Sequence, residues 1–211
     1  MKIVIVDYGL GNLWSVRNAF EFMGIDITVS SDPSVVAQSQ ILVLPGVGNF
    51  GTGMKNLHSL GLVDALNEAV IQQGVPILGI CLGMQLFADE SEEAPGIKGL
   101  GWISGKVSRF KKQDIRLPHM GFNTASFTLE KKHKFIGMHG EALDFYFVHS
   151  YYFIPQNKES ILAHTTYGVE FVSAVTNNTI IGVQFHPEKS QSNGLRLIAN
   201  FLKFSYENNY S

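Results

Sequence analysis

The feature that most constrains this chain is residues 76–85, a stretch that holds its only cysteine, Cys81. An apolar run rich in branched residues precedes the cysteine and is too short for a helix, so it predicts a buried strand. Gly79 and Gly83 flank Cys81 at the spacing of a nucleophile elbow. In such a sharp strand-to-helix turn the glycines prevent collisions, and the sulfur points at a helix N-terminus, where the thiolate is favoured.

A lone cysteine has a simpler interpretation as a core residue, because free cysteine is among the most buried residue types. A chain with such an inert cysteine could be a binding module without catalytic activity. The flanking glycines favour a nucleophile instead. A single cysteine also leaves no partner for an internal disulfide, so we expect a cytoplasmic location.

The composition indicates large buried surfaces. Of the 211 residues, 45% are hydrophobic and 16% are charged, and the charged share lies below the roughly 25% typical of globular domains. The formal net charge of −2 gives no reason to expect nucleic-acid binding. The first apolar run ends at Asp7, far short of a secretory signal or a membrane span of about 20 residues. We therefore expect one domain over residues 1–211 and no membrane segment.

The N-terminal segment predicts the first strand and turn of a parallel sheet. A Val/Ile run within residues 2–7 is typical of a strand that is buried on both faces. Gly9 and Gly11 follow, as in a dinucleotide-binding loop. However, Trp14 stands where the third glycine of that fingerprint belongs, and no suitable acid ends the second strand. A tight strand–helix loop is therefore the favoured interpretation.

A second glycine-rich loop is expected at residues 45–51, after another apolar strand. It lacks the Gly-Lys-Ser/Thr sequence of a phosphate-binding loop, so phosphate is not its expected ligand. Its glycines can present successive backbone N–H groups and can switch between two conformations. Such a loop can stabilise an oxyanion that develops during catalysis.

The remaining patterns divide the chain into a parallel half and an antiparallel half. In the first we expect strands at residues 25–30 and 41–44, with a short helix or loop between them. Helices are expected at residues 62–70, which Gly74 ends, and at residues 195–204 near the C-terminus. The other half alternates short strands and turns, which is typical of antiparallel sheet added to a parallel core. Its expected strands are residues 106–110, 125–129, 142–152, 161–165, 171–175 and 180–185.

A thiol nucleophile needs a base, and His186 is the best candidate among the seven histidines. It follows an apolar strand that Pro187 ends. Glu188 stands two residues further on, so on an extended backbone its carboxylate can accept a hydrogen bond from one ring nitrogen of His186. The other ring nitrogen then faces Cys81.

The other histidines carry weaker signals. His119 and His149 lie in well-defined segments, but neither has a motif that assigns it a role. One cysteine and histidines without paired spacing do not make a zinc site, so no metal is expected. Surface positions are the default expectation for His58, His133, His139 and His164.

Three motifs together resemble the class I glutamine amidotransferase family. They are Pro-Gly-Val-Gly at residues 45–48, the cysteine elbow at residues 78–85 and Val-Gln-Phe-His-Pro-Glu-Lys-Ser at residues 183–190. The resemblance implies an α/β, flavodoxin-like fold. Its mixed, mostly parallel central sheet is flanked by helices, with additional antiparallel strands in the C-terminal half. It implies no cofactor.

The family's mechanism, carried over to the matching residues, makes Cys81 the nucleophile that attacks the side-chain amide of L-glutamine. His186 acts as base and then as acid to the departing ammonia, and Glu188 orients His186. Water then hydrolyses the γ-glutamyl thioester to glutamate.

The resemblance also implies which residues surround the substrate. The implied oxyanion donors are the backbone N–H groups of Leu82 and of Val47 or Gly48. The implied contacts with glutamine come from Gln85, Glu93 and the backbone of His149, Ser150 and Tyr151. Because the loop at residues 45–51 is flexible, we expect weak activity until a partner orders it.

More selective motifs resemble the glutaminase subunits of imidazole glycerol phosphate synthases, and they occupy residues 7–13, 118–123 and 146–151. That resemblance runs from residue 2 to the final helix. It implies a heterodimer with a (β/α)₈ cyclase in histidine biosynthesis, which receives the ammonia through its barrel and converts PRFAR to imidazole glycerol phosphate and AICAR. The implied interface residues are Asn12, Phe122, Tyr146 and Lys189.

Phe122 departs from the family, which commonly has tryptophan at this position. The change removes packing area and an indole N–H. It leaves open an alternative with the same chemistry: a paralogue that supplies ammonia to a sugar-modifying enzyme in surface polysaccharide synthesis.

Overall fold

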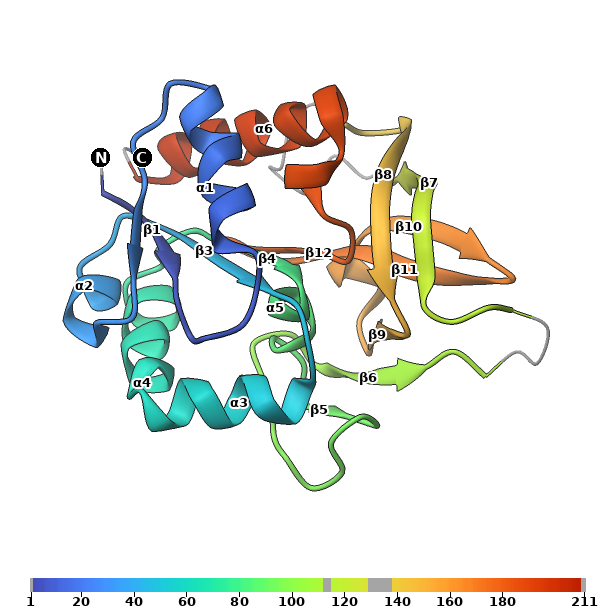
Figure 1. The fold of residues 1–211 in the computed structure, drawn as a ribbon, viewed down its shortest axis with the longest axis horizontal. Coiled ribbons are helices and arrows are strands. Elements are labelled where there is room, and N and C mark those ends of the chain that lie inside the picture. Colours follow the sequence, from blue (N-terminus) through green and yellow to red (C-terminus); the bar gives the residue numbers. More distant parts are fainter. Residues whose placement is uncertain (1, 112–114, 129–137, 210–211) are drawn as a thin grey trace.

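The structure is a computed structural model that describes residues 2–111, 115–128 and 138–209. Within these residues, the strands join into one sheet of 12 strands (Figure 1). One half of this sheet is parallel and carries helices on both faces, and the other half is antiparallel except for one short parallel pair at residues 90–91 and 106–107. The mixed α/β architecture agrees with the predicted fold class.

The parallel half is the buried centre of the molecule. In spatial order its strands are β2 (Thr28–Ser30), β1 (Ile3–Val6), β3 (Ile41–Gly46), β4 (Ile77–Cys81) and β12 (Ile180–Val183). Every residue of β1, β3, β4 and β12 is buried, which confirms the two-sided burial predicted for the first strand. The sequence assigned residues 180–185 to the antiparallel half, whereas β12 pairs with β4 in parallel. Because β3, β4 and β12 are parallel, their carboxyl ends meet at one edge.

Helices on the two faces of this half build two separate cores. Ile3 and Ile5 of β1 belong to one core and Val4 and Val6 to the other, as the two-residue period of a strand requires. The first core is covered by α1 (Leu13–Phe22) and α6 (Gln191–Asn209), and the second by α2 (Pro33–Ala37), α3 (Phe50–Ser59) and α4 (Leu62–Leu66) (Figure 1).

The antiparallel half continues from β12. The main path runs through β11 (Val169–Asn177), β10 (Ile161–Tyr167), β7 (His119–Phe127) and β8 (Ala142–His149). A branch joins at β11 and consists of β9 (Tyr151–Pro155), β6 (Gly105–Arg109) and β5 (Glu90–Ser91). β8 and β9 are thus consecutive in the chain but pair with different strands.

The prediction of one strand over residues 142–152 is wrong, because the chain bends at Ser150. Up to His149 the segment pairs with β7, and from Tyr151 onward it pairs with β6. The apolar and aromatic pattern continues through the bend and hides it. The backbone that the family resemblance assigns to glutamine binding is this bend.

β7 begins much earlier than the predicted strand at residues 125–129. It pairs with β8 from His119 to Ser126, although Gly121 has φ of +125° and several side chains are exposed. Glycine and polar residues weaken a strand pattern, so only the apolar end was recognised. Residue 129 lies outside the described residues.

The glycine loop is shorter than predicted. β3 extends to Gly46 and α3 begins at Phe50, so the connection is only residues 47–49. The sequence did not predict α3, because Gly51 and Gly53 interrupt its apolar stripe. Gly53 lets the helix approach closely, since a Cβ there would lie 3.3 Å from Leu86.

The predicted helix at residues 62–70 is α4 followed by a π-helical segment, Asn67–Gln72. The predicted helix at residues 195–204 lies within α6. The other predicted strands are present, with ends displaced by up to three residues. No helix within the described part of the chain is long and apolar enough to cross a membrane.

Candidate active site

Cys81 occupies a strained turn between β4 and the short helix α5 (Leu82–Gln85). Its φ is +54°, a region that residues with a side chain rarely adopt and that costs on the order of 1–3 kcal/mol. The flanking glycines are needed because neighbouring groups approach closely. A Cβ at Gly79 would lie 2.5 Å from the Phe87 ring, and one at Gly83 would collide with the Leu44 carbonyl. This is the elbow geometry that the sequence predicted.

His186 and Glu188 form a buried hydrogen-bonded pair. The distance from His186 Nδ1 to Glu188 Oε1 is 2.8 Å, and both side chains are 2% exposed. The sequence suggested an extended backbone between them, but the structure has a turn there instead. Pro187 begins a 3₁₀ turn, Pro187–Lys189, that brings the carboxylate back to the ring. The His186 N–H donates to the Tyr146 carbonyl at 2.8 Å, which fixes the start of the turn.

The electrostatics of this pair depend on Cys81. Burial by itself lowers the pKa of His186, but the interactions with Cys81 and Glu188 outweigh it and raise that pKa to about 10. Nε2 of His186 is buried and has no hydrogen-bond partner among the described residues, so it is available to exchange a proton. An imidazolium here favours negative charge on the neighbouring sulfur.

Cys81 opens onto a pocket of about 240 Å³. The predicted oxyanion and glutamine-contact residues all lie around it, together with Pro118 and Val148, to which the sequence assigned no individual role. His186 and Glu188 do not line the pocket. The lining residues are Val47, Gly48, Cys81, Leu82, Gln85, Glu93, Pro118, Val148, His149, Ser150 and Tyr151.

Glu93 and Gln85 make structural contacts within this wall. Glu93 Oε2 accepts a hydrogen bond of 2.7 Å from the backbone N–H of Phe50, so it holds the end of the glycine loop. The buried Gln85 amide donates to the Tyr151 carbonyl and to Gln184 Oε1, each at 3.0 Å. Gln85 and Glu93 therefore line the pocket and also hold its wall in place.

Gln184 is a site residue that sequence reasoning missed. It is fully buried, and its Nε2 lies 3.6 Å from Cys81 Sγ. The available signal was its position two residues before His186, after the same strand. The thiol of Cys81 also contacts the Val148 carbonyl, at 3.9 Å.

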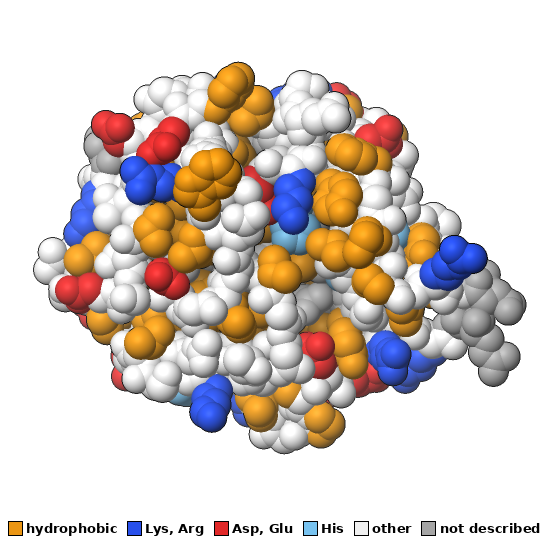
Figure 2. All heavy atoms as spheres, in the orientation of Figure 1, with side chains coloured by type: hydrophobic (Ala, Val, Ile, Leu, Met, Phe, Trp, Pro, Cys, Tyr) orange, Lys and Arg blue, Asp and Glu red, His pale blue; other side chains and the backbone are white. Residues whose placement is uncertain are grey.

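Three of the four predicted interface residues cluster on one surface. The rings of Phe122 and Tyr146 meet edge to face at 5.7 Å, and Lys189 Nζ lies 5.7 Å from the Tyr146 ring centroid. Phe122 is 53% exposed. Asn12 is exposed and caps α1, with Oδ1 accepting from the Ser15 N–H. Figure 2 shows apolar side chains over the part of the molecule where Figure 1 draws β8.

The remaining sequence expectations have mixed outcomes. The loop at Gly9 and Gly11 is tight, with both residues at positive φ and Gly11 packed on Gly46. Of the four histidines expected at the surface, His58 is exposed, whereas His139 and His164 are half-buried. His133 lies outside the described residues. Among the described residues, no group of His, Cys, Asp or Glu could hold a metal ion.

Comparisons with known proteins support one family. Residues 4–204 match the family described as "Glutamine amidotransferase class-I". The chain is 47% identical over 202 residues to "Imidazole glycerol phosphate synthase subunit HisH 2" of Methanococcus maripaludis, covering 95% of this chain and 98% of that protein. It is 44% identical over 199 residues to "Imidazole glycerol phosphate synthase subunit HisH" of Moorella thermoacetica, covering 94% and 93%.

The fold also matches solved structures. One, described as "Crystal structure of glutamine amidotransferase", has a TM-score of 0.74 and 20% identity, and the match covers 96% of this chain and 98% of that one. At this identity the likeness concerns the fold alone.

Proposed function

The chain belongs to the class-I glutamine amidotransferase family, and we propose that it is the glutaminase subunit of an imidazole glycerol phosphate synthase. Relatives with that name are 44% and 47% identical over nearly their whole length, which supports the assignment. The observation that carries the chemistry is the buried His186–Glu188 pair beside the Cys81 elbow. The reaction converts glutamine and water to glutamate and ammonia.

In the first step His186 takes the proton of the Cys81 thiol, and the sulfur attacks the amide carbon of glutamine. The C–N bond breaks as His186 gives this proton to the departing ammonia, which leaves a γ-glutamyl thioester on Cys81. In the second step His186 takes a proton from the water that attacks the thioester and returns it to the departing sulfur, which releases glutamic acid, ionised to glutamate at neutral pH, and restores the thiol. Glu188 accepts from Nδ1 throughout, so Nε2 is the nitrogen that exchanges the proton.

Both tetrahedral intermediates need donors for their oxyanion. Leu82 directly follows the nucleophile, and Val47 and Gly48 line the same pocket, which supports the assignment of their N–H groups as the oxyanion hole. Loss of one such donor typically costs about 3–4 kcal/mol of barrier stabilisation. We assign glutamine binding to Gln85, Glu93 and the bend at His149, Ser150 and Tyr151.

The chain acts as one domain in a cytoplasmic heterodimer. Its partner is a (β/α)₈ cyclase that uses the ammonia to convert PRFAR to imidazole glycerol phosphate and AICAR in histidine biosynthesis. The surface of Phe122, Tyr146 and Lys189, with Asn12 nearby, is the proposed docking site. The surface-polysaccharide alternative rests on Phe122 alone and is not favoured by the relatives' names.

The test is glutamate release with and without a cyclase subunit of imidazole glycerol phosphate synthase and PRFAR. We expect weak release alone and strong release with both. Absence of release under every condition, or equal release after Cys81→Ala, would contradict the enzymatic proposal. Release that the cyclase leaves unchanged would assign the chain to another synthase.

A further inference from the structure

Two buried histidines outside the proposed triad face each other across β7 and β8. His119 and His149 are paired residues in the antiparallel ladder, and they are 3% and 6% exposed. His119 Nδ1 lies 3.0 Å from His149 Nε2. The His119 ring is stacked between Phe147 and Tyr167, with ring centroids 4.8 and 4.0 Å away. The short distance between the two ring nitrogens and the aromatic stacking hold His119 and His149 in direct contact.

The neighbouring groups determine where each proton lies. His149 Nδ1 is 2.8 Å from the Tyr151 carbonyl, which can only accept, so Nδ1 carries the hydrogen and Nε2 is an acceptor. His119 must then donate from Nδ1. Its Nε2 is left to accept, and the Asn123 amide nitrogen lies 3.1 Å away.

The orientation of the Asn123 amide is fixed independently. Its nitrogen also donates to the Thr166 carbonyl at 2.9 Å, and its oxygen accepts from the Thr124 N–H at 2.8 Å. The hydrogen bonds therefore run in one direction, from Asn123 through His119 and His149 to Tyr151. The three hydrogen bonds are satisfied together only while both imidazoles are neutral. Burial, the main cause in each case, lowers the pKa of His119 to about 4 and that of His149 to about 3.

The relay ends at the wall of the Cys81 pocket. The Tyr151 carbonyl accepts from both His149 Nδ1 and Gln85 Nε2. This carbonyl lies at the bend between β8 and β9, where the two strands pair with different neighbours. Backbone pairing holds the bend against β6, since Tyr151 lies opposite Arg109 and the Phe110 N–H donates to the Ser150 carbonyl at 3.3 Å. The two side-chain hydrogen bonds restrain the Tyr151 carbonyl in addition to this pairing.

We propose that Asn123, His119 and His149 form a one-way relay of neutral hydrogen-bonding groups that positions the bend at Ser150 for glutamine binding. The inference rests on the proposed glutaminase function. His119 is a positioning residue: it does not line the pocket and acts through His149, Tyr151 and Gln85.

The test uses binding and a spectroscopic signature. In a Cys81→Ala background, which prevents turnover, calorimetric titration with L-glutamine should show about tenfold weaker binding after His119→Leu, because His149 Nε2 loses its donor. His119→Asn should restore most of the affinity, since the amide nitrogen of the introduced asparagine can replace Nδ1. His58→Leu, at an exposed position on α3, is the matched control and should bind like the parent.

Nitrogen-15 NMR of the imidazole rings gives a readout that is independent of glutamine. At pH 7 both His119 and His149 should be neutral, with the hydrogen on Nδ1. A hydrogen on Nε2 of either ring, or unchanged glutamine affinity after His119→Leu, would overturn the relay. By contrast, if the parent chain never releases glutamate, the glutaminase proposal is refuted. That result does not bear on the tautomers of His119 and His149, which the NMR measurement tests separately.

Discussion

Gly46, the last residue of β3, lies directly opposite Cys81, the last residue of β4, in the parallel ladder. The residue after Gly46 begins the proposed oxyanion loop, and the residue after Cys81 is the proposed second donor. One pair of adjacent strand ends therefore sets the relative position of nucleophile and both donors. The carboxyl ends of parallel strands meet at one edge of a sheet, and this register thereby brings the proposed nucleophile and the proposed donors together.

Gly46→Ala should reduce glutamate release without unfolding the chain. A Cβ at this position would collide with the Tyr8 hydroxyl and lie 2.8 Å from Leu82 Cβ, so the donor next to it must shift. We expect kcat to fall by about 10²–10³, the usual cost of losing one oxyanion donor.

The matched control for this variant is Gly24→Ala. Gly24 has φ of +73° with open space around it, so alanine there strains the backbone far from the pocket. It should lower the free energy of unfolding by about 1 kcal/mol and leave kcat unchanged. Equal kcat in the Gly46→Ala variant and the parent would refute the role of this strand end.

The sequence predicted the centre of the fold better than its periphery. Short apolar runs rich in branched residues correctly identified β1 and β4, because burial on both faces leaves a strong local pattern. The bend at Ser150 left no such signal. It arises because His149 and Tyr151 pair with different strands, which is a tertiary event.

The candidate site shows the same division. Cys81, His186 and Glu188 could be proposed from the sequence because each belongs to a compact motif. The role of Gln184 and the contact between His119 and His149 depend on residues brought together from distant segments, so spacing alone could not reveal them.

Glu188→Gln should impair catalysis and shift its pH dependence. The carboxylate helps to raise the pKa of His186 and holds the ring through Nδ1, so the amide should lower that pKa and loosen the ring. We expect kcat to fall by about 10²–10⁴, by analogy with loss of the orienting acid in other triads. The check is a pH profile of glutamate release, whose basic limb should move to lower pH.

A carboxylate elsewhere supplies the control for that experiment. Glu159 is an exposed residue in a 3₁₀ turn, and Glu159→Gln should leave both kcat and the profile unchanged. A Glu188→Gln profile that coincides with the parent's would contradict the orienting role.

The free energy of unfolding should decrease as the pH falls from about 6.5 towards 4. His119 and His149 have folded-state pKa values of about 4 and 3, below the value near 6.5 expected for an unfolded chain. Below pH 6.5 the unfolded state therefore binds more protons, which favours unfolding. Urea titrations at several pH values should show a smaller acid dependence after His119→Leu, and an unchanged dependence would contradict the neutral pair.

Phe122→Ala should weaken binding of the cyclase, whereas Phe122→Trp should preserve or strengthen it. The half-exposed ring packs edge to face on Tyr146, so alanine removes an aromatic contact and tryptophan extends it. Truncating an aromatic anchor at an interface typically costs 2 kcal/mol or more, about a 30-fold rise in Kd. Titration of labelled cyclase measures the Kd of each variant.

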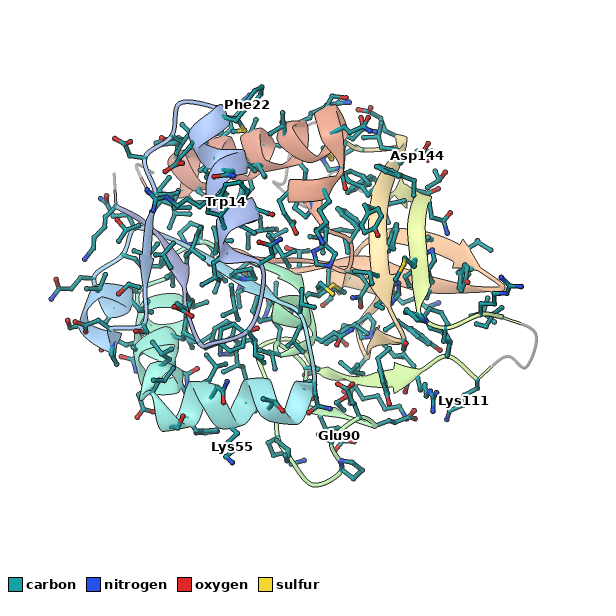
Figure 3. All side chains as sticks on the ribbon, viewed as in Figure 1. Trp14, Phe22, Lys55, Glu90, Lys111 and Asp144 are labelled. Carbon is teal, nitrogen blue, oxygen red and sulfur yellow. The ribbon has the colours of Figure 1, made fainter. Side chains whose placement is uncertain are left out.

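The control for this experiment is Phe22, which is 80% exposed at the far end of α1 (Figure 3). Phe22→Ala should leave Kd unchanged. Equal effects of the two alanine variants would place the interface elsewhere.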